Sequence, residues 1–229
     1  MTLNATADSP DSVKLDILSD PICPWCYIGK SRLDAALAQV PDHPFEIEWH
    51  PFQLNPDMPA EGMDRRDYLE TKFGGKAGAV AAYAPIVEHA EAEGLNIDFD
   101  GMTRTPNTLD AHRLIHWAGV EGVQTEVVDA LFQAYFVEGR DIGDHATLAD
   151  VADSCSLDAS VVLRLLVSDA DREDIRSRDQ QAREMGVNSV PTFIVARQHA
   201  VPGAQPAELW LKVIGELIGQ ANRTGSAGS

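Results

Sequence analysis

Basic residues are scarce in this chain of 229 residues, which has 18 lysines and arginines against 36 aspartates and glutamates. The formal net charge is −18 at pH 7, and this surplus of negative charge disfavours nucleic acid as a partner. Long apolar runs are also missing, since none approaches the ~20 residues that span a bilayer. The chain opens without the basic and apolar segments of a secretory signal. We therefore expect a cytoplasmic protein with neither a membrane partner nor a nucleic-acid partner.

Cysteine is rare as well, because the chain has three in all, too few for a disulfide-stabilised scaffold. Cys23 and Cys26 belong to a single motif in which they flank Pro24 and Trp25. The third, Cys155, follows apolar residues at offsets of seven, four and three positions, the spacing of one helix face. Free cysteine packs as a small hydrophobe, so we expect Cys155 to be a buried structural thiol.

The sequence places the motif at the junction of a strand and a helix. Residues 13–18 alternate between apolar and charged, the period of a strand, and Ser19, Asp20 and Pro21 then interrupt the pattern. Pro24 suits the first turn of a helix, where a missing N–H leaves no partner unpaired. The apolar residues that follow recur at helical spacing: Leu33, Ala36, Leu37 and Val40. Cys23 is therefore predicted at a helix N-terminus.

A cysteine in such a position is suited to redox chemistry. Unpaired backbone N–H groups and the helix dipole favour a thiolate, and cysteines at such sites have pKa values of roughly 3.5–7.5. Cys26 lies one helical turn away, where Cβ atoms are about 5–6 Å apart, so a small adjustment of side chains joins the two sulfurs. We predict that one cysteine attacks a disulfide and the other resolves the product.

A metal site is the alternative interpretation of these side chains. A lone pair of cysteines at this spacing is also half of a zinc site, but tetrahedral zinc needs four ligands and no second such pair exists. His112 and His116 share a helix face, yet the glutamate of the zinc-protease motif is missing between them. We expect no metal.

The remaining patterns predict an interrupted α/β domain. Residues 45–49 alternate as a second strand, the signals from 64 to 185 are almost wholly helical, and Gly186 is a plausible end for that helical block. Strands follow at 192–195 and 198–201, and Pro206 begins a last helix. We predict one domain from residues 13–62 and 187–221, a helical insertion at 63–186, and flexible tails at 1–12 and 222–229.

This order of elements, with the cysteine motif after the first strand and Val190 and Pro191 just before the third, resembles the DsbA family. The resemblance implies an α/β, thioredoxin-like fold with a large all-helical insertion. It also implies that Pro191 follows a cis peptide bond, lies beside the redox cysteines and acts with them. The Val190 backbone would then form a short edge to which an extended peptide or glutathione binds.

Further motifs are similar to the FrnE-like branch of that family. They are the segments at 20–29, 52–56, 106–108, 111–114 and 203–206. The chain differs from the pattern of that branch in two ways. Asn188 and Ser189 precede Val190 where a glycine often stands, and the additional C-terminal cysteine pair of some members is absent. Electron transfer through a second pair is therefore excluded.

We thus predict Cys23, Cys26 and Pro191 as catalytic residues of a thiol-disulfide oxidoreductase. The predicted substrate-binding residues are Val190, Trp25, Pro24, Phe52 and His112. The substrate is a protein or small molecule with a disulfide or dithiol, no cofactor is required, and glutathione is a candidate co-substrate. The sequence does not determine the oligomeric state.

Two rival functions stay open. Kappa-class glutathione transferases and hydroxychromene-carboxylate isomerases share the inserted architecture, although they typically have serine at the position of Cys23. The second rival is a non-catalytic holdase whose helical lobe binds unfolded segments. Such a holdase would retain its activity after loss of both cysteines.

Overall fold

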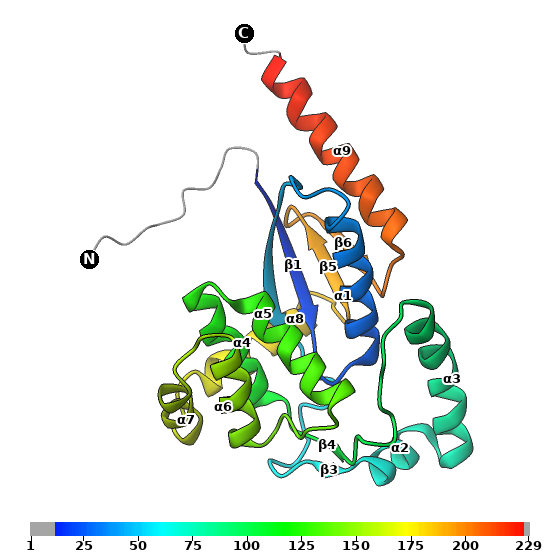
Figure 1. Cartoon of the computed structure of the whole chain (residues 1–229), viewed down its shortest axis with the longest axis vertical. Coiled ribbons are helices and arrows are strands. Elements are labelled where there is room, and N and C mark those ends of the chain that lie inside the picture. The colour runs from blue at the N-terminus through cyan, green and yellow to red at the C-terminus, as the bar shows by residue number, and fades with distance from the viewer. Residues whose placement is uncertain (1–11, 227–229) are drawn as a thin grey trace.

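The central sheet unites the two ends of the sequence. The computed structural model describes residues 12–226. Its four main strands are β1 (Val13–Ser19), β2 (Phe45–Pro51), β5 (Thr192–Val195) and β6 (His199–Pro202). They lie in the order β2, β1, β5, β6, with β1 and β2 parallel and the other neighbours antiparallel (Figure 1). This is the sheet that the resemblance to the DsbA family implies.

β1 is more deeply buried than its alternating sequence suggests. Neighbouring strands and helices cover both of its faces, so Leu15 and Ile17 on one face and Asp16 and Leu18 on the other are all buried. A buried carboxylate needs a partner, and an Oδ1 atom of Asp16 lies 3.1 Å from Nε2 of His50 on β2. The Asp16 carboxylate is therefore an internal polar contact of this strand, whereas Lys14 is partly exposed and pairs with Glu46.

Two helices lie along the sheet. α1 (Pro24–Leu37) follows the cysteine motif, and α9 (Ala207–Ser226) packs against it. The ring of Trp210 on α9 meets the edge of Phe193 on β5 with centroids 4.7 Å apart, which ties α9 to the sheet. α9 continues to Ser226, so the prediction of a flexible tail from residue 222 is wrong for residues 222–226. Residues 1–11 and 227–229 lie outside the described residues.

The inserted segment supplies most of the helices. These are α2 (Arg65–Phe73), α3 (Lys76–Ala92), α4 (Leu109–Glu121), α5 (Gln124–Phe132), the π-helix η1 (Gln133–Val137), α6 (His145–Ser154), α7 (Ala159–Val167) and α8 (Arg172–Glu184). A short antiparallel pair, β3 (Met63–Asp64) and β4 (Arg104–Thr105), closes the loop that carries α2 and α3. Gly186 has a φ of +91° just after α8, which confirms the predicted end of the helical block.

The insertion surrounds the start of α1. Figure 1 shows α2 and α3 on one side of this helix end and α4 and α5 on the other. On the α5 side, the ring of Tyr27 stacks on Phe132 at 5.2 Å, and Lys30 pairs with Asp129 at 2.6 Å. The motif of Cys23 and Cys26 thus lies where the domain of the central sheet meets the helical insertion. Over residues 12–226, no helix has both the length and the apolar character to cross a membrane.

Candidate active site

Cys23 and Cys26 occupy the first turn of α1. Cys23 is the N-cap, with its N–H donating to the carbonyl oxygen of Asp20 at 2.9 Å, and Pro24 follows it as the first helical residue. The carbonyl oxygen of Cys23 accepts from the N–H of Cys26 at 3.0 Å, which closes the first turn. Both residues are free thiols, 4% and 1% exposed respectively. The predicted strand-to-helix junction is confirmed.

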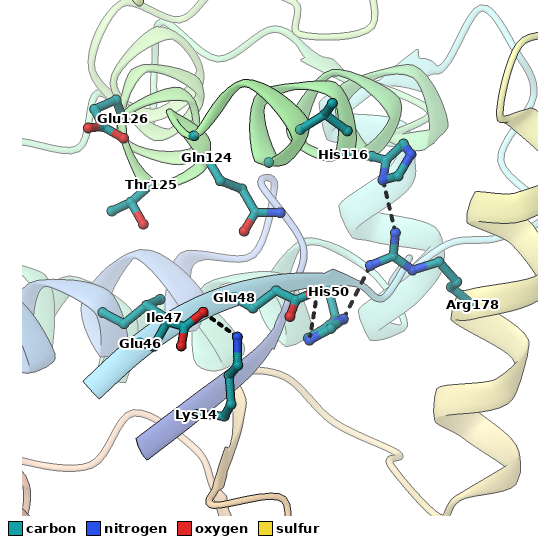
Figure 2. A pocket seen from close by; sticks show the side chains of 13 residues that line it. Lys14, Glu46, Ile47, Glu48, His50, His116, Gln124, Thr125, Glu126 and Arg178 are labelled. Atoms are coloured by element: carbon teal, nitrogen blue, oxygen red, sulfur yellow. Dashed lines mark hydrogen bonds and ion pairs between the residues drawn. The ribbon is translucent and has the colours of Figure 1, made fainter. Parts of the chain in front are cut away.

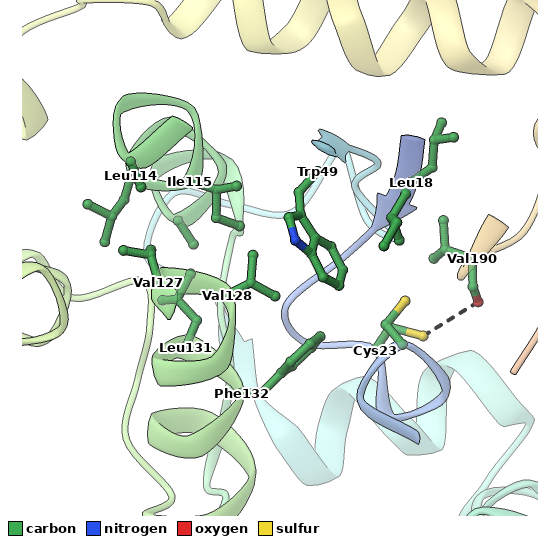
Figure 3. Packing of buried hydrophobic residues seen from close by; sticks show 14 of the residues in the cluster. Leu18, Cys23, Trp49, Leu114, Ile115, Val127, Val128, Leu131, Phe132 and Val190 are labelled. Atoms are coloured by element: carbon green, nitrogen blue, oxygen red, sulfur yellow. Dashed lines mark hydrogen bonds between the residues drawn. The ribbon is translucent and has the colours of Figure 1, made fainter. Parts of the chain in front are cut away.

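A loop from the other end of the domain lies against Cys23. The peptide bond between Val190 and Pro191 is cis, as the resemblance implies. The Cys23 sulfur lies 3.7 Å from the carbonyl oxygen of Val190 (Figure 3). Gly29 allows this close approach, because a Cβ at its position would meet Cγ of Pro191 at 3.0 Å. The structure therefore brings together the three residues predicted as catalytic.

Burial determines the protonation state of Cys26. Loss of water raises the pKa of its thiol well above the usual value, and the adjacent Cys23 raises it further. The Ser19 hydroxyl and the backbone of Asp20 lower it, but these effects are smaller. Cys26 is thus held as a neutral thiol at neutral pH. Any reaction in which it becomes a nucleophile needs a group that accepts its proton.

Asp20 is a buried carboxyl group that joins the turn before Cys23 to the loop after β2. Its two oxygens accept from the N–H of Ile22 at 3.3 Å and from the N–H of Leu54 at 2.7 Å. Complete burial raises the pKa of Asp20 to about 7, although these hydrogen bonds oppose the rise. From the sequence, Asp20 is predicted only as part of a strand break, and its position three residues before Cys23 is the one signal that links it to the cysteines.

A buried arginine lies on the α2 side of the site. The Arg65 guanidinium donates to the hydroxyl oxygens of Tyr135 at 3.2 Å and Tyr83 at 3.1 Å. Among residues 12–226, no carboxylate lies within 4.0 Å of Arg65. Burial raises the pKa of Tyr83, and the Cys23 sulfur is one of the charges that raise it further. A buried guanidinium whose side-chain partners are two neutral phenols therefore lies near Cys23, and periodicity gave no signal for it.

The DSBA-like thioredoxin domain matches residues 14–215, most of the chain. The chain belongs to this family. It is 27% identical over 209 residues to the uncharacterized protein YwbO of Bacillus subtilis (strain 168), covering 90% of this chain and 97% of that one. The crystal structure of the probable DsbA oxidoreductase SCO1869 from Streptomyces coelicolor is 31% identical, with a TM-score of 0.79 and 90% of each chain covered.

A more distant structural relative carries a ligand. The cytosolic disulfide reductase DsbM from Pseudomonas aeruginosa, solved with GSH, has a TM-score of 0.65. At 17% identity over 90% of this chain and 98% of that one, it shows likeness of fold alone. Together these comparisons confirm the DsbA-like fold and the resemblance to the FrnE-like branch.

Few of the side chains predicted to bind substrate lie at the surface. Trp25 is half-buried and meets the edge of His89 on α3 at 5.3 Å between ring centroids. Phe52 is 2% exposed, because the Arg183 guanidinium covers its ring at 4.1 Å, and His112 is 3% exposed. A substrate cannot contact Phe52 or His112 in this conformation. Pro24 is buried beside Cys23, and Val190 offers chiefly its backbone.

Two other histidines, His50 and His116, form a polar network along the edge of β2. Figure 2 shows Arg178 between them, with Nη1 3.1 Å from Nδ1 of His116 and Nη2 3.2 Å from Nδ1 of His50. Guanidinium groups only donate, so Nδ1 of a neutral His50 accepts and its Nε2 donates to Asp16. Asp16, Glu48 and His50 have potential ligand atoms within 4.8 Å of one another, but this hydrogen bonding occupies both ring nitrogens of His50.

Cys155 is less buried than predicted. It caps the end of α6 and is of intermediate exposure, packing only in part against the core. The apolar spacing before it holds for Leu148, Val151 and Ala152, which are buried, but the helix ends before Cys155 completes that face. It lies outside the redox motif and provides a control thiol.

Proposed function

We propose that this protein is a thiol-disulfide oxidoreductase that exchanges disulfides through Cys23 and Cys26. The observation that carries the proposal is the meeting of Cys23, at the start of α1, with the backbone of Val190 at 3.7 Å. Membership of the DsbA-like family, whose named relatives include a probable oxidoreductase, supports the same chemistry. The pair needs no bound cofactor, since its two sulfurs carry the two electrons.

The reaction proceeds through a mixed disulfide. The Cys23 thiolate attacks one sulfur of a substrate disulfide, a bond forms between them, and the other substrate sulfur leaves as a thiolate. Cys26 then loses its proton and attacks the Cys23 sulfur. The bond between the two cysteines forms, the mixed disulfide breaks, and the second substrate thiolate leaves. The protein is oxidised by two electrons and the substrate disulfide is reduced. The reverse sequence oxidises a substrate dithiol.

The expected substrates and location follow from the same chemistry. The Val190 backbone beside Cys23 suits an extended peptide or glutathione, which would bind by main-chain hydrogen bonds. The GSH in the DsbM structure and the name of that protein, a cytosolic disulfide reductase, support glutathione as co-substrate and the cytoplasm as compartment. The direction of electron flow depends on the reduction potential, for which ~30 mV corresponds to ~1.4 kcal/mol.

The decisive experiment is a redox titration in glutathione buffers, with acid quench, alkylation and intact-mass readout. We expect a reversible oxidation shared by Cys23 and Cys26, in which the pair loses two protons and two electrons to the glutathione couple. Replacing Cys23 with serine should abolish exchange, whereas Cys26→Ser should accumulate a mixed disulfide on Cys23. Cys155→Ser is the matched control and should titrate as the wild type does. Equal activity in the Cys23 and Cys26 variants would contradict the mechanism.

The rival functions give different results in the same titration. A persistent glutathione adduct on Cys23 of the wild type would favour a glutathione-dependent isomerase or transferase. No change at either cysteine, together with suppression of client aggregation by the double cysteine variant, would favour the holdase. We expect neither.

A further inference from the structure

Arg32 on α1 is bound by two segments of the chain that are far apart in the sequence. Its Nε donates to Oε1 of Glu93, at the end of α3, at 2.6 Å, and its Nη2 lies 3.1 Å from Nδ1 of His89 on α3. Its Nη1 donates to the carbonyl oxygen of Ala204, between β6 and α9, at 2.7 Å. All three nitrogens of the guanidinium are therefore engaged, and the side chain is 12% exposed.

The contact with His89 leads to Trp25, between the two cysteines. Arg32 follows Trp25 by seven residues, or two helical turns, so both side chains lie on one face of α1. His89 contacts both of them. A guanidinium only donates, so Nδ1 of His89 accepts from Arg32, and its ring meets the ring of Trp25 with centroids 5.3 Å apart. Ala90 of α3 packs against Ile28 on the same side, so α3 covers the face of α1 that presents Trp25 (Figure 1).

The contact with Ala204 leads to the loop that lies against Cys23. Gly203, the residue before Ala204, donates its N–H to the carbonyl oxygen of Pro191 at 2.8 Å. Pro191 follows Val190, whose carbonyl oxygen lies 3.7 Å from the Cys23 sulfur. The guanidinium is therefore linked through short contacts to both of the groups predicted to bind substrate next to this sulfur, one an indole and the other a backbone edge.

We propose that Arg32 is a positioning residue that holds the ring of Trp25 and the backbone of Val190 at a fixed separation beside Cys23. The inference rests on the proposed function, and it specifies the class of substrate that depends on this arrangement. A disulfide carried on a peptide main chain can contact both groups at once. A small disulfide without a main chain contacts only the sulfur. Arg32 itself touches neither the substrate nor the cysteines.

The geometry of these contacts requires an arginine. The guanidinium is planar and presents its donors in several directions from one rigid group. Lysine would keep the charge and its attraction to Glu93, but a compact ammonium does not span acceptors on two separate segments. A purely electrostatic role for Arg32 would thus survive in Arg32→Lys, whereas a positioning role would not.

The test compares two disulfides in single turnovers. Reduced protein is mixed with increasing concentrations of glutathione disulfide, which has a peptide main chain, or of 2-hydroxyethyl disulfide, which has none. Acid quench, alkylation and intact mass give the limiting rate and the half-saturating concentration for each. The wild type should half-saturate at a lower concentration of glutathione disulfide. In Arg32→Lys we expect that concentration to rise about 10-fold or more, while the values for 2-hydroxyethyl disulfide change by less than about 2-fold.

A second variant separates the two contacts. His89→Ala removes the contact with Trp25 but keeps the bond from Arg32 to Ala204. It should raise the half-saturating concentration of glutathione disulfide by about 3-fold or more. In the double variant the two effects should combine to less than their product, because both pass through the same contact. His89 is only half-buried, so this variant keeps the test valid if Arg32→Lys fails to fold.

Arg140→Lys is the matched control. Arg140 also pairs with carboxylates, those of Asp150 at 2.6 Å and Glu138 at 3.8 Å, and both partners lie in the helical insertion. The substitution removes the same guanidinium from a place outside the candidate active site. Both disulfides should react with Arg140→Lys as they do with the wild type.

Fluorescence tests the arrangement without any reaction. Trp25 is half-buried, whereas the other three tryptophans of the chain are buried. The emission of Trp25 is obtained as the difference between each protein and its Trp25→Phe counterpart. It should shift to longer wavelength in Arg32→Lys and in His89→Ala, because the indole gains contact with water, and should not shift in Arg140→Lys.

The outcomes separate this inference from the proposed function. Equal losses with both disulfides would show that Arg32 acts only on the stability of the fold, and wild-type half-saturating concentrations in Arg32→Lys would show that it is dispensable. Either result overturns the inference and leaves disulfide exchange intact, as would an unchanged Trp25 emission in Arg32→Lys. A wild type that exchanges neither disulfide would refute the proposed function, and the inference would fall with it.

Discussion

The Cys23 sulfur lies 3.7 Å from the carbonyl oxygen of Val190, so residues 167 positions apart in the sequence meet at the candidate active site. The contact depends on how closely α1 approaches the loop that contains Pro191. The absence of a side chain at Gly29 sets that distance, because a Cβ there would lie 3.0 Å from Cγ of Pro191 and 3.4 Å from Cα of Ala204. The two halves of the site are therefore placed by a single glycine.

Gly29→Ala should lower the rate of disulfide exchange while it changes the free energy of unfolding only slightly. Alanine favours a helix interior over glycine by about 1 kcal/mol, which offsets part of the crowding at Pro191. We expect the free energy of unfolding to change by less than about 1 kcal/mol, while displacement of the Pro191 loop lowers the rate of disulfide exchange. Gly29→Val adds more volume at the same place and should destabilise by about 1–3 kcal/mol.

Gly215→Ala is the control for this prediction. Gly215 lies in α9, and a Cβ at its position would meet nothing within 4 Å. The substitution should therefore raise the free energy of unfolding in urea by up to about 1 kcal/mol and leave the exchange rate unchanged. A Gly29→Ala variant that exchanges disulfides at the rate of Gly215→Ala would show that the close approach to Pro191 has no catalytic role.

Asp20 should make the protein less stable as the pH rises. The pKa of Asp20 is about 7 in the folded protein, whereas the ordinary value is 3.8. At pH values between these two, the folded state therefore binds more protons than the unfolded state. Stability is then lost progressively from about pH 4 to pH 7, by on the order of 4 kcal/mol. Urea denaturation of the wild type and Asp20→Asn across this range should show the difference. A constant difference would contradict the raised pKa.

His112 should have the opposite effect. Its pKa is about 3 in the folded protein against 6.5 as the ordinary value, because burial and Arg178 disfavour the imidazolium. The unfolded state then binds more protons, and stability is lost as the pH falls from about 6.5 to 3, by on the order of 5 kcal/mol. His112→Gln should abolish this loss in urea denaturation at acid pH. An unchanged acid response in the variant would show that other groups cause it.

The sequence predicted the part of the site that local patterns encode, because Cys23 and Cys26 follow a strand and begin a helix. The cis bond before Pro191 was expected from the resemblance to the DsbA family, not from a local pattern. Asp20 was missed because nothing local shows that a carboxyl group in a strand break is fully buried. Phe52 and His112 were predicted near the substrate but lie under other side chains, because burial depends on the tertiary packing of α4 and α8.

The same limit applies to Arg113, which sequence patterns place only on a helix of the insertion. Its guanidinium is fully buried and donates to the carbonyl oxygens at the end of α7 and just beyond it, namely those of Leu165, Leu166, Ser168 and Ala170. It also pairs with Asp110 at 2.8 Å. One side chain thus donates to several carbonyl oxygens at a helix C-terminus and joins α4 to α7.

Arg113→Met should destabilise the protein by about 3–5 kcal/mol, because methionine fills the space but removes the guanidinium donor from the carbonyl oxygens of Leu166, Ser168 and Ala170 and leaves Asp110 without this partner. Arg113→Lys should recover only part of the loss, since an ammonium cannot reach both sides of the carbonyl cluster. Arg176→Met is the control, because Arg176 is exposed and its pairing with Glu173 at 4.0 Å is weak. Urea denaturation should give a change below about 0.5 kcal/mol for that variant, and a similar small value for Arg113→Met would mean that water replaces the guanidinium without cost.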